Sequence, residues 1–254
     1  MYPVFRSWLF RLDPEQVHDL TLYLVQLAGR IPPARFWLRA MFEVSDPRLE
    51  VAAFGMRFKN PVGLAAGYDK NGVAVQGLSC LGFGHIEVGT VTRSPQAGNR
   101  KPRIHRLPQA GAIINSMGFP NAGVDALKVS RGTTRVGINI GKSKETPLEQ
   151  AAQDYVELLK RVHGQADYVA LNVSSPNTPG LRALQSRAAI EDLLRAVVAT
   201  RNNLTPHVPI LVKIAPDLDN AQVDDILTAV AACGKTRPAR RATGRLFCRR
   251  SMRQ

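Results

Sequence analysis

The chain has 254 residues, of which 44% are hydrophobic and 21% are charged, and its formal net charge is +14. A chain of this length can bury one sizeable core, as a single barrel or as two small domains. No apolar run reaches the roughly 18 to 20 residues that a membrane-spanning helix needs. The first residues lack the long apolar core and the small-residue cleavage site of a secretory signal.

The positive charge is concentrated at one end of the chain. Residues 235–254 hold eight basic residues and no acidic one, so they supply +8 of the +14 and the rest of the chain supplies +6. A general nucleic-acid-binding surface is therefore not expected. Three widely spaced cysteines and five histidines without metal-ligand spacing predict a reducing compartment, no disulfide framework and no metal site.

Residues 1–45 are predicted to be helical. Asp13 suits the N-cap of a helix, Pro14 its first position and Gln16 a capping box, and Gly29 with the prolines after it should end that helix. A second short helix is predicted over 34–42. Two interpretations stay open: a helical hairpin packed on the rest of the protein, or an interfacial anchor, because aromatic residues and arginines on short amphipathic helices suit a membrane surface.

After a hairpin that turns near Gly55, a strand followed by a helix is predicted five times. The strand-like runs are 62–66, 85–90, 135–140, 168–173 and 210–215, and the helix-like segments are 71–81, 121–130, 146–163, 187–202 and 219–232. This repeat indicates a parallel sheet with crossover helices. A (β/α) barrel is favoured, and an open doubly wound sheet is the alternative.

Polar residues stand at the ends of successive predicted strands. They are Gly67 with Asp69 and Lys70, Thr90, Asn139, Asn172 with Ser175, and Lys213. In a barrel the carboxyl ends of the strands converge on one centre, whereas an open sheet spreads them along a line. No GxGxxG motif follows the first strand, which further weakens the doubly wound alternative.

Two loops are candidates for the site itself. The stretch 168–180 begins as a buried strand and then breaks into amides, hydroxyls, prolines and a glycine, which is typical of a loop that carries chemistry or of a self-capped turn. The insert 93–120 is longer than ordinary βα loops. Its apolar second half predicts an ordered flap over the site.

Several motifs together resemble the dihydroorotate dehydrogenase family, in that family's order and at its spacing. They are the segments 63–72 (GLAAGYDKNG), 87–90 (EVGT), 115–119 (NSMGF), 137–142 (GINIGK) and 172–182 (NVSSPNTPGLR). The resemblance covers about residues 1–234. It is greatest to the membrane-associated, quinone-using class, because the helical extension is present and Ser175 stands where the soluble class has cysteine.

The resemblance implies an FMN-containing (β/α)8 barrel that oxidises dihydroorotate to orotate in pyrimidine synthesis and passes the electrons to a quinone. A peripheral location at the cytoplasmic face of the bacterial inner membrane is implied with it. Ser175 matches the catalytic base, with Thr178 in its surroundings. The implied substrate contacts are Lys70, Asn115, Ser116, Met117, Gly118, Phe119, Asn172 and Asn177. The implied cofactor contacts are Ala66, Gly67, Tyr68, Asp69, Lys70, Thr90, Asn139, Asn172 and Lys213. His18 and Arg103 match residues of the quinone tunnel.

The chain departs from the family after Gly234. Five of eight βα units are recognised, and the glycine-rich loops that would hold the FMN phosphate are not found. Residues 235–254 instead form a basic, nonperiodic segment that we expect to be an aberrant and disordered tail. We therefore divide the chain into an extension (1–45), a partial barrel (46–234) and this tail, and expect the polypeptide itself to be inactive. The alternatives are a non-catalytic membrane-associating fragment and a related FMN barrel that acts on another dihydropyrimidine.

Overall fold

The computed structural model describes residues 2–130, 132–234 and 246–250. The helices are α1 (Tyr2–Leu9), α2 (Pro14–Arg30), α3 (Pro32–Phe42), α4 (Val75–Leu78), α5 (Ala151–Val162), α6 (Arg187–Asn202) and α7 (Asn220–Gly234). The strands are β1 (Val51–Ala53), β2 (Met56–Phe58), β3 (Gly63–Leu64), β4 (His85–Val91), β5 (Ile104–Leu107), β6 (Ala112–Asn115), β7 (Arg135–Ile140), β8 (Tyr168–Asn172), β9 (Ile210–Ile214) and β10 (Leu246–Arg250).

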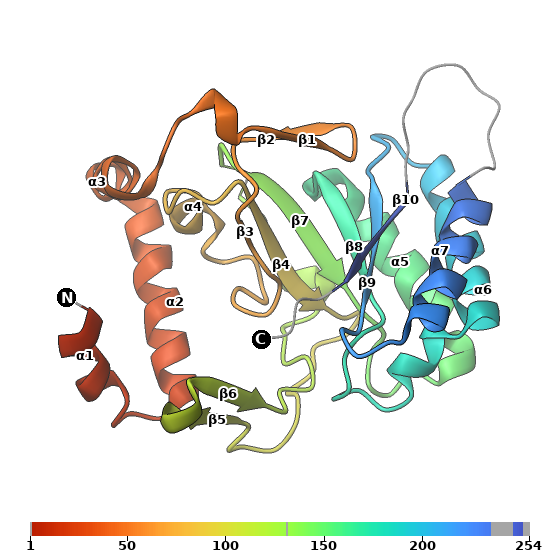
Figure 1. The fold of residues 1–254 in the computed structure, drawn as a ribbon, viewed down its shortest axis with the longest axis horizontal. Helices are drawn as coiled ribbons and strands as arrows, with labels where there is room; N and C mark the ends of the chain where they lie inside the picture. The colour runs from red at the N-terminus through yellow and green to blue at the C-terminus, as the bar shows by residue number, and fades with distance from the viewer. Residues whose placement is uncertain (1, 131, 235–245, 251–254) are drawn as a thin grey trace.

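A curled parallel sheet forms the centre of the molecule (Figure 1). Its six strands lie in the order β10-β9-β8-β7-β4-β3, so each strand pairs with the next strand of the sheet along the chain. A doubly wound sheet would reverse this order at a switch point, whereas a (β/α) barrel keeps it. The barrel prediction is confirmed as a partial barrel, in which β3 and β10 are the edge strands among the described residues.

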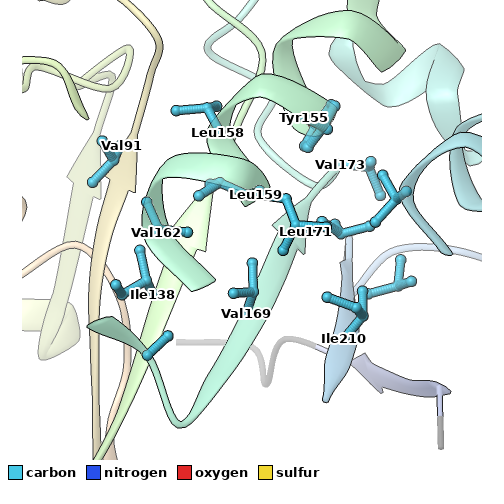
Figure 2. Close-up of a cluster of buried hydrophobic side chains, with 14 of the residues drawn as sticks. Val91, Ile138, Tyr155, Leu158, Leu159, Val162, Val169, Leu171, Val173 and Ile210 are labelled. Atoms are coloured by element: carbon cyan, nitrogen blue, oxygen red, sulfur yellow. The ribbon is translucent and has the colours of Figure 1, made fainter. Parts of the chain in front are cut away.

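The two faces of the sheet differ in chemistry because side chains alternate along each strand. The outer face carries β-branched and aliphatic residues that pack under α5, α6 and α7, including Ile138, Leu171 and Val212. Figure 2 shows Val162 of α5 over Ile138, Leu159 beside Leu171 and Tyr155 near Val173, and these residues belong to one buried cluster. The inner face instead becomes polar toward the carboxyl ends of the strands.

The N-terminal extension lies on the side of the sheet away from α5–α7, where α2 packs against α4 and β5 (Figure 1). The carboxylate of Asp13 accepts hydrogen bonds from the backbone N–H groups of Glu15 and Gln16, at 2.9 and 3.1 Å, which confirms the predicted N-cap. Gly29 does not end α2, which continues to Arg30. A Cβ at Gly29 would lie 2.5 Å from the backbone nitrogen of Gly77, so this glycine lets α2 and α4 approach closely.

Three predicted segments differ from the structure. The predicted helix 71–81 is reduced to α4, because the Asp69 carboxylate caps the chain only at Val73 and Ala74, at 3.0 and 2.8 Å. The predicted helix 121–130 is a single 3₁₀ turn, Val124–Ala126, since Gly123 lies at φ +80° immediately before it. Residues 246–250, expected in a disordered tail, form β10 and pair in parallel with β9; their apolar Leu-Phe-Cys run suits a strand. The rest of that expectation falls on residues 235–245 and 251–254, outside the described residues.

The insert 93–120 is ordered, as predicted. It contains the antiparallel hairpin β5–β6, which lies beside the start of α2 (Figure 1). Within the described part of the chain, no helix is both long and apolar enough to span a bilayer.

Candidate active site

A cavity of about 750 Å³ opens at the carboxyl ends of the parallel strands, between the sheet, α2 and the hairpin β5–β6. This is within the size range of small-molecule and cofactor sites. Fourteen of the predicted site residues line it: His18, Ala66, Gly67, Tyr68, Lys70, Thr90, Asn115, Met117, Gly118, Phe119, Asn172, Ser175, Asn177 and Lys213. Of the residues predicted at strand ends, Gly67, Lys70, Thr90, Asn172, Ser175 and Lys213 converge on this cavity.

Four predicted residues lie outside the lining. Asp69 is buried and caps the turn before α4. Asn139 is fully buried behind Thr90 and Asn172. The backbone of Ser116 is bonded to Arg103 and to the Asn99 side chain.

Arg103, the fourth, was predicted in a quinone tunnel but is buried in an ion pair. Its guanidinium donates to Glu15, with Nη2 to Oε1 at 2.6 Å, and to the carbonyls of Ala97 and Asn99. The hydrogen bonds from Arg103 hold the pKa of Glu15 below its usual value. Arg103 therefore ties the loop before β5 to the first turn of α2.

Arg106 lines the cavity where Arg103 does not. It donates to the carbonyl of Leu12 at 2.9 Å, and its guanidinium lies 4.7 Å from the centre of the Phe10 ring. Arg106 is not among the site residues predicted from the sequence. Strand alternation offered a signal, because Ile104 and Arg106 share one face of β5 and both line the cavity.

Two basic side chains, Lys70 and His18, meet where α2 contacts the loop after β3. Lys70 Nζ lies 3.5 Å from His18 Nε2, and the ring of His18 packs edge-on against Tyr68. Burial lowers the pKa of Lys70, and burial together with the charge of Lys70 lowers the pKa of His18. This corner of the cavity therefore favours neutral groups unless an anion enters.

The loop after β8 is held by its own polar groups. The Asn172 side chain accepts from the backbone and hydroxyl of Ser174, at 3.1 and 2.8 Å, and the Tyr155 hydroxyl donates to the Asn172 carbonyl at 2.7 Å. Ser175 Oγ accepts from the backbone N–H of Asn177 at 3.2 Å. Thr178 Oγ1 is buried and has no hydrogen-bond partner among the described residues. A buried hydroxyl in that state can accept a water molecule or a proton.

A bulge and a glycine open the floor of the cavity. The pairing of β4 with β7 shifts between Val88 and Val91, which places an extra residue at the strand end and turns Thr90 inward. Gly67, at φ +116°, lines the cavity, and a Cβ there would meet no atom within 4 Å. The side chain that Gly67 lacks leaves room for a ligand against the backbone.

Comparison with known proteins points to one family. A family model described as dihydroorotate dehydrogenase matches residues 48–236. A dihydroorotate dehydrogenase (quinone) of Stutzerimonas stutzeri is 49% identical over 92% of this chain and 69% of its own length, and one of Anaeromyxobacter dehalogenans is 46% identical over 92% of this chain and 65% of its own. The chain thus spans about two thirds of the length of these relatives.

A solved structure gives the same result for the fold. The dihydroorotate dehydrogenase of Eimeria tenella, in complex with ferulenol, superposes with a TM-score of 0.77 and is 36% identical, over 87% of this chain and 64% of that one. This chain belongs to the dihydroorotate dehydrogenase family.

Proposed function

We propose that this cavity is the site of an FMN-dependent oxidation of dihydroorotate to orotate, with a quinone as the final electron acceptor and pyrimidine synthesis as its role. One observation carries the proposal: a serine, three amides and two lysines from separate loops and strands line one cavity in a member of this family. The relatives' printed names, which specify a quinone, support the choice of acceptor.

FMN fits the sheet side of the cavity. Ala66 and the open backbone at Gly67 provide a surface without side-chain obstruction, and Thr90 and Asn172 provide polar groups beside it. Lys213, at the end of β9, would face the pyrimidine edge of the flavin and stabilise negative charge there. When bound, FMN supplies the two-electron acceptor that none of the twenty side chains can provide.

The flap side of the cavity suits a dihydropyrimidine acid. Asn115 and Asn177 offer amide donors and acceptors, which match a ring edge that alternates C=O and N–H. Asn172 lines the same cavity, with its own amide bonded to Thr90, Asn139 and Ser174. The Lys70 ammonium would pair with the substrate carboxylate. Such an anion would also favour the charged form of Lys70, which burial disfavours.

Ser175 would take the proton from C5 of the substrate while hydride leaves C6. A serine hydroxyl is a weak base, so its own proton needs a route out of the site. The buried, unpartnered Thr178 Oγ1 supports such a route, because a trapped water could join the two hydroxyls. With Ser175 as the base, Asn172 and Asn177 would contact the ring of the substrate.

The quinone would approach between α2 and the hairpin. His18, Val17, Arg106 and Ile113 line that part of the cavity, so we assign Arg106 to the tunnel in place of Arg103. The exposed aromatic residues of α3 support a peripheral attachment to the membrane on the same side of the molecule, at the cytoplasmic face of the bacterial inner membrane.

The decisive experiment is FMN and orotate titration of the purified full chain. Flavin absorbance in a stoichiometric complex, followed by a spectral change with orotate, is expected if the site is competent for ligands. A chain that binds vesicles but neither ligand would favour the non-catalytic fragment. Flavin reduction by another dihydropyrimidine, but not by dihydroorotate, would favour the related barrel.

Steady-state turnover needs a stable site as well as ligand binding. We predict little steady-state activity from this chain, because its described sheet has two edge strands, β3 and β10, in place of a closed barrel. Dihydroorotate-driven quinone reduction by the same samples tests this prediction, and sustained turnover would contradict it.

A further inference from the structure

A hydrogen-bonded network of buried polar side chains crosses three neighbouring strands on the inner face of the sheet. Glu87 of β4 is 1% exposed and Asn139 of β7 is 0% exposed, and neither lines the cavity. Thr90 and Asn172 join them to the cavity, which both residues line. A carboxylate buried in the middle of an apolar strand is costly unless its hydrogen bonds are satisfied.

The hydrogen bonds that join these side chains all run in one direction, from donors near the cavity to acceptors nearer Glu87. A carboxylate oxygen only accepts, so Asn139 must present its Nδ2 to Glu87 Oε1, at 2.9 Å. Asn139 Oδ1 consequently faces the cavity side and accepts from Thr90 Oγ1 at 2.6 Å and from Asn172 Nδ2 at 3.2 Å. Asn172 Nδ2 also donates to Thr90 Oγ1 at 2.9 Å. The orientation of each group thus depends on the group before it.

The hydrogen-bond network continues into the loop that carries Ser175. With its Nδ2 turned toward Thr90 and Asn139, Asn172 presents Oδ1 to the backbone N–H and the hydroxyl of Ser174. An Asn139 amide turned the other way would place Oδ1 against the carboxylate and leave Thr90 and Asn172 facing an NH₂ group. Buried groups mispaired in this way carry a full desolvation penalty, so one orientation prevails.

We propose that Glu87 is a positioning residue for the cavity, which fixes the Asn139 amide and through it presents Thr90 and Asn172 to a ligand in one orientation. The functional part of this inference rests on the proposed FMN site. Glu87 touches no ligand in this scheme. It acts two hydrogen bonds away from the cavity surface, across adjacent strands of the sheet.

Four variants separate positioning from simple stability. Glu87→Met keeps the length of the side chain but removes the acceptor. Glu87→Gln keeps an acceptor for Asn139 and turns its amide nitrogen toward the Tyr168 hydroxyl. Tyr168→Phe removes the bond from Tyr168 to Glu87 Oε2, at 3.2 Å, and leaves the bond to Asn139. Ile138→Ala destabilises β7, the strand of Asn139, from its outer face, where Ile138 is fully buried.

The first readout is FMN affinity, measured by fluorescence titration well below each variant's unfolding temperature. We expect Glu87→Met to bind FMN at least tenfold more weakly than the unmodified chain. Glu87→Gln, Tyr168→Phe and Ile138→Ala should stay within about threefold. Equal weakening in Glu87→Met and Ile138→Ala, or no weakening in Glu87→Met, would overturn the proposal.

The second readout does not depend on FMN. The side-chain NH₂ signals of Asn139 and Asn172, assigned by their loss in the two Asn→Asp variants, should exchange slowly in the unmodified chain and in Glu87→Gln. They should shift and exchange faster in Glu87→Met. If the unmodified chain binds no FMN, the proposed function fails at its cofactor, and these signals alone decide the positioning role: unchanged signals in Glu87→Met overturn it.

Folding failure of Glu87→Met would not end the test. Glu87→Asp then replaces it, because the shorter carboxylate keeps the charge but withdraws the acceptor from Asn139. The same shift of the amide signals, and the same weakening of FMN binding where FMN binds, are expected. Amide signals unchanged in Glu87→Asp would overturn the proposal.

Discussion

Single residues at the cavity have roles that can be separated by substitution. Ser175 is held by the N–H of Asn177, and Thr178 Oγ1 lies buried in the same loop without a described hydrogen-bond partner. A base that works through a relay requires both groups to stay out of bulk water. The loop therefore combines exposure of Ser175 to the cavity with burial of Thr178.

We predict that Ser175→Ala slows flavin reduction by dihydroorotate roughly 10²–10⁴-fold, the usual contribution of a positioned general base. Single-turnover bleaching of the FMN-loaded chain by excess dihydroorotate is the measurement, because it detects one slow reduction per molecule. Ser186→Ala is the matched control, since Ser186 is exposed and its side chain caps no helix N–H group. Equal bleaching rates in Ser175→Ala and the unmodified chain would remove Ser175 from the mechanism.

We expect Lys70 to destabilise the folded chain and to strengthen ligand binding in the cavity. Its pKa is lowered from the ordinary 10.5 by burial, so the folded chain holds this proton less tightly than the unfolded chain. Stability therefore falls as pH drops through the window below 10.5 and is lowest where the ammonium is fully charged. We predict that Lys70→Met raises the melting temperature at pH 7, and that the gain shrinks as pH approaches 10.

The same substitution should weaken orotate binding about 10- to 100-fold, as expected for the loss of a charge-assisted hydrogen bond. Lys144→Met serves as the control, because Lys144 is exposed. Calorimetry at pH 7 to 10 and orotate titration are the measurements. A melting temperature that falls in Lys70→Met, together with unchanged orotate affinity, would show that Lys70 is a structural lysine.

At the scale of elements, the sequence predicted what apolar periodicity controls. The strands β4, β7, β8 and β9 and the helix α6 lie within a residue or two of the predicted ranges, because each is a buried run with clear breaks. The predicted helix boundaries are wrong where a single hydrogen bond or a single glycine sets the start or the length of a helix. Asp69 delays α4, and Gly123 cuts a predicted helix to one 3₁₀ turn.

Which arginine lines the cavity could not be predicted from the sequence either. Arg103 and Arg106 stand three residues apart, and only the structure shows that Glu15 pairs with Arg103 while Arg106 lines the cavity. Glu87 did carry a signal, because it is the one acidic residue within the apolar run 85–91. Its role became visible only with the register of β4, β7 and β8.

The hairpin β5–β6 is tied to α2 by the Arg103–Glu15 pair, which is almost fully buried, with side-chain exposures of 6% and 11%. Removing one partner of a buried pair typically costs about 3–5 kcal/mol. We predict that Glu15→Gln lowers the melting temperature by roughly 6–12 °C, which corresponds to about 3 kcal/mol for a chain of this size. Glu50→Gln is the control, because Glu50 and Arg57 form an exposed pair that should contribute about 0–1 kcal/mol.

The pair also predicts an acid dependence. The pKa of Glu15 is held below 4.5 by Arg103, so its stabilising contribution is present above that value and is lost as pH falls through the lower, folded-state pKa. Melting temperatures measured from pH 6 to 3 should therefore converge for Glu15→Gln and the unmodified chain. Curves that stay parallel over this range would show that the charge of Glu15 contributes nothing.

At the scale of the whole molecule, most of the exposed large apolar residues among the described part of the chain lie within residues 1–45. The extension α1–α3 lies on the side of the sheet away from α5–α7 (Figure 1), and its exposed large apolar residues include Phe36, Trp37 and Met41, at 67%, 65% and 68% exposure. Exposed aromatic and aliphatic side chains on a short helix suit the boundary between headgroups and acyl chains. The cavity opens beside α2, so attachment there would place the membrane on the side of the molecule where the quinone path is proposed.

We predict that replacing Phe36, Trp37 and Met41 together with serine lowers partitioning into anionic phospholipid vesicles by more than tenfold, because each apolar side chain loses roughly 1.5–3 kcal/mol of favourable transfer. Sedimentation with vesicles measures the change. Leu227→Ser is the control, since Leu227 is 46% exposed on α7, on the opposite side of the sheet. FMN and orotate binding in solution should be unchanged in both variants, because none of the four residues lines the cavity. Vesicle binding that survives the triple substitution would mean that the three α3 side chains do not carry membrane attachment.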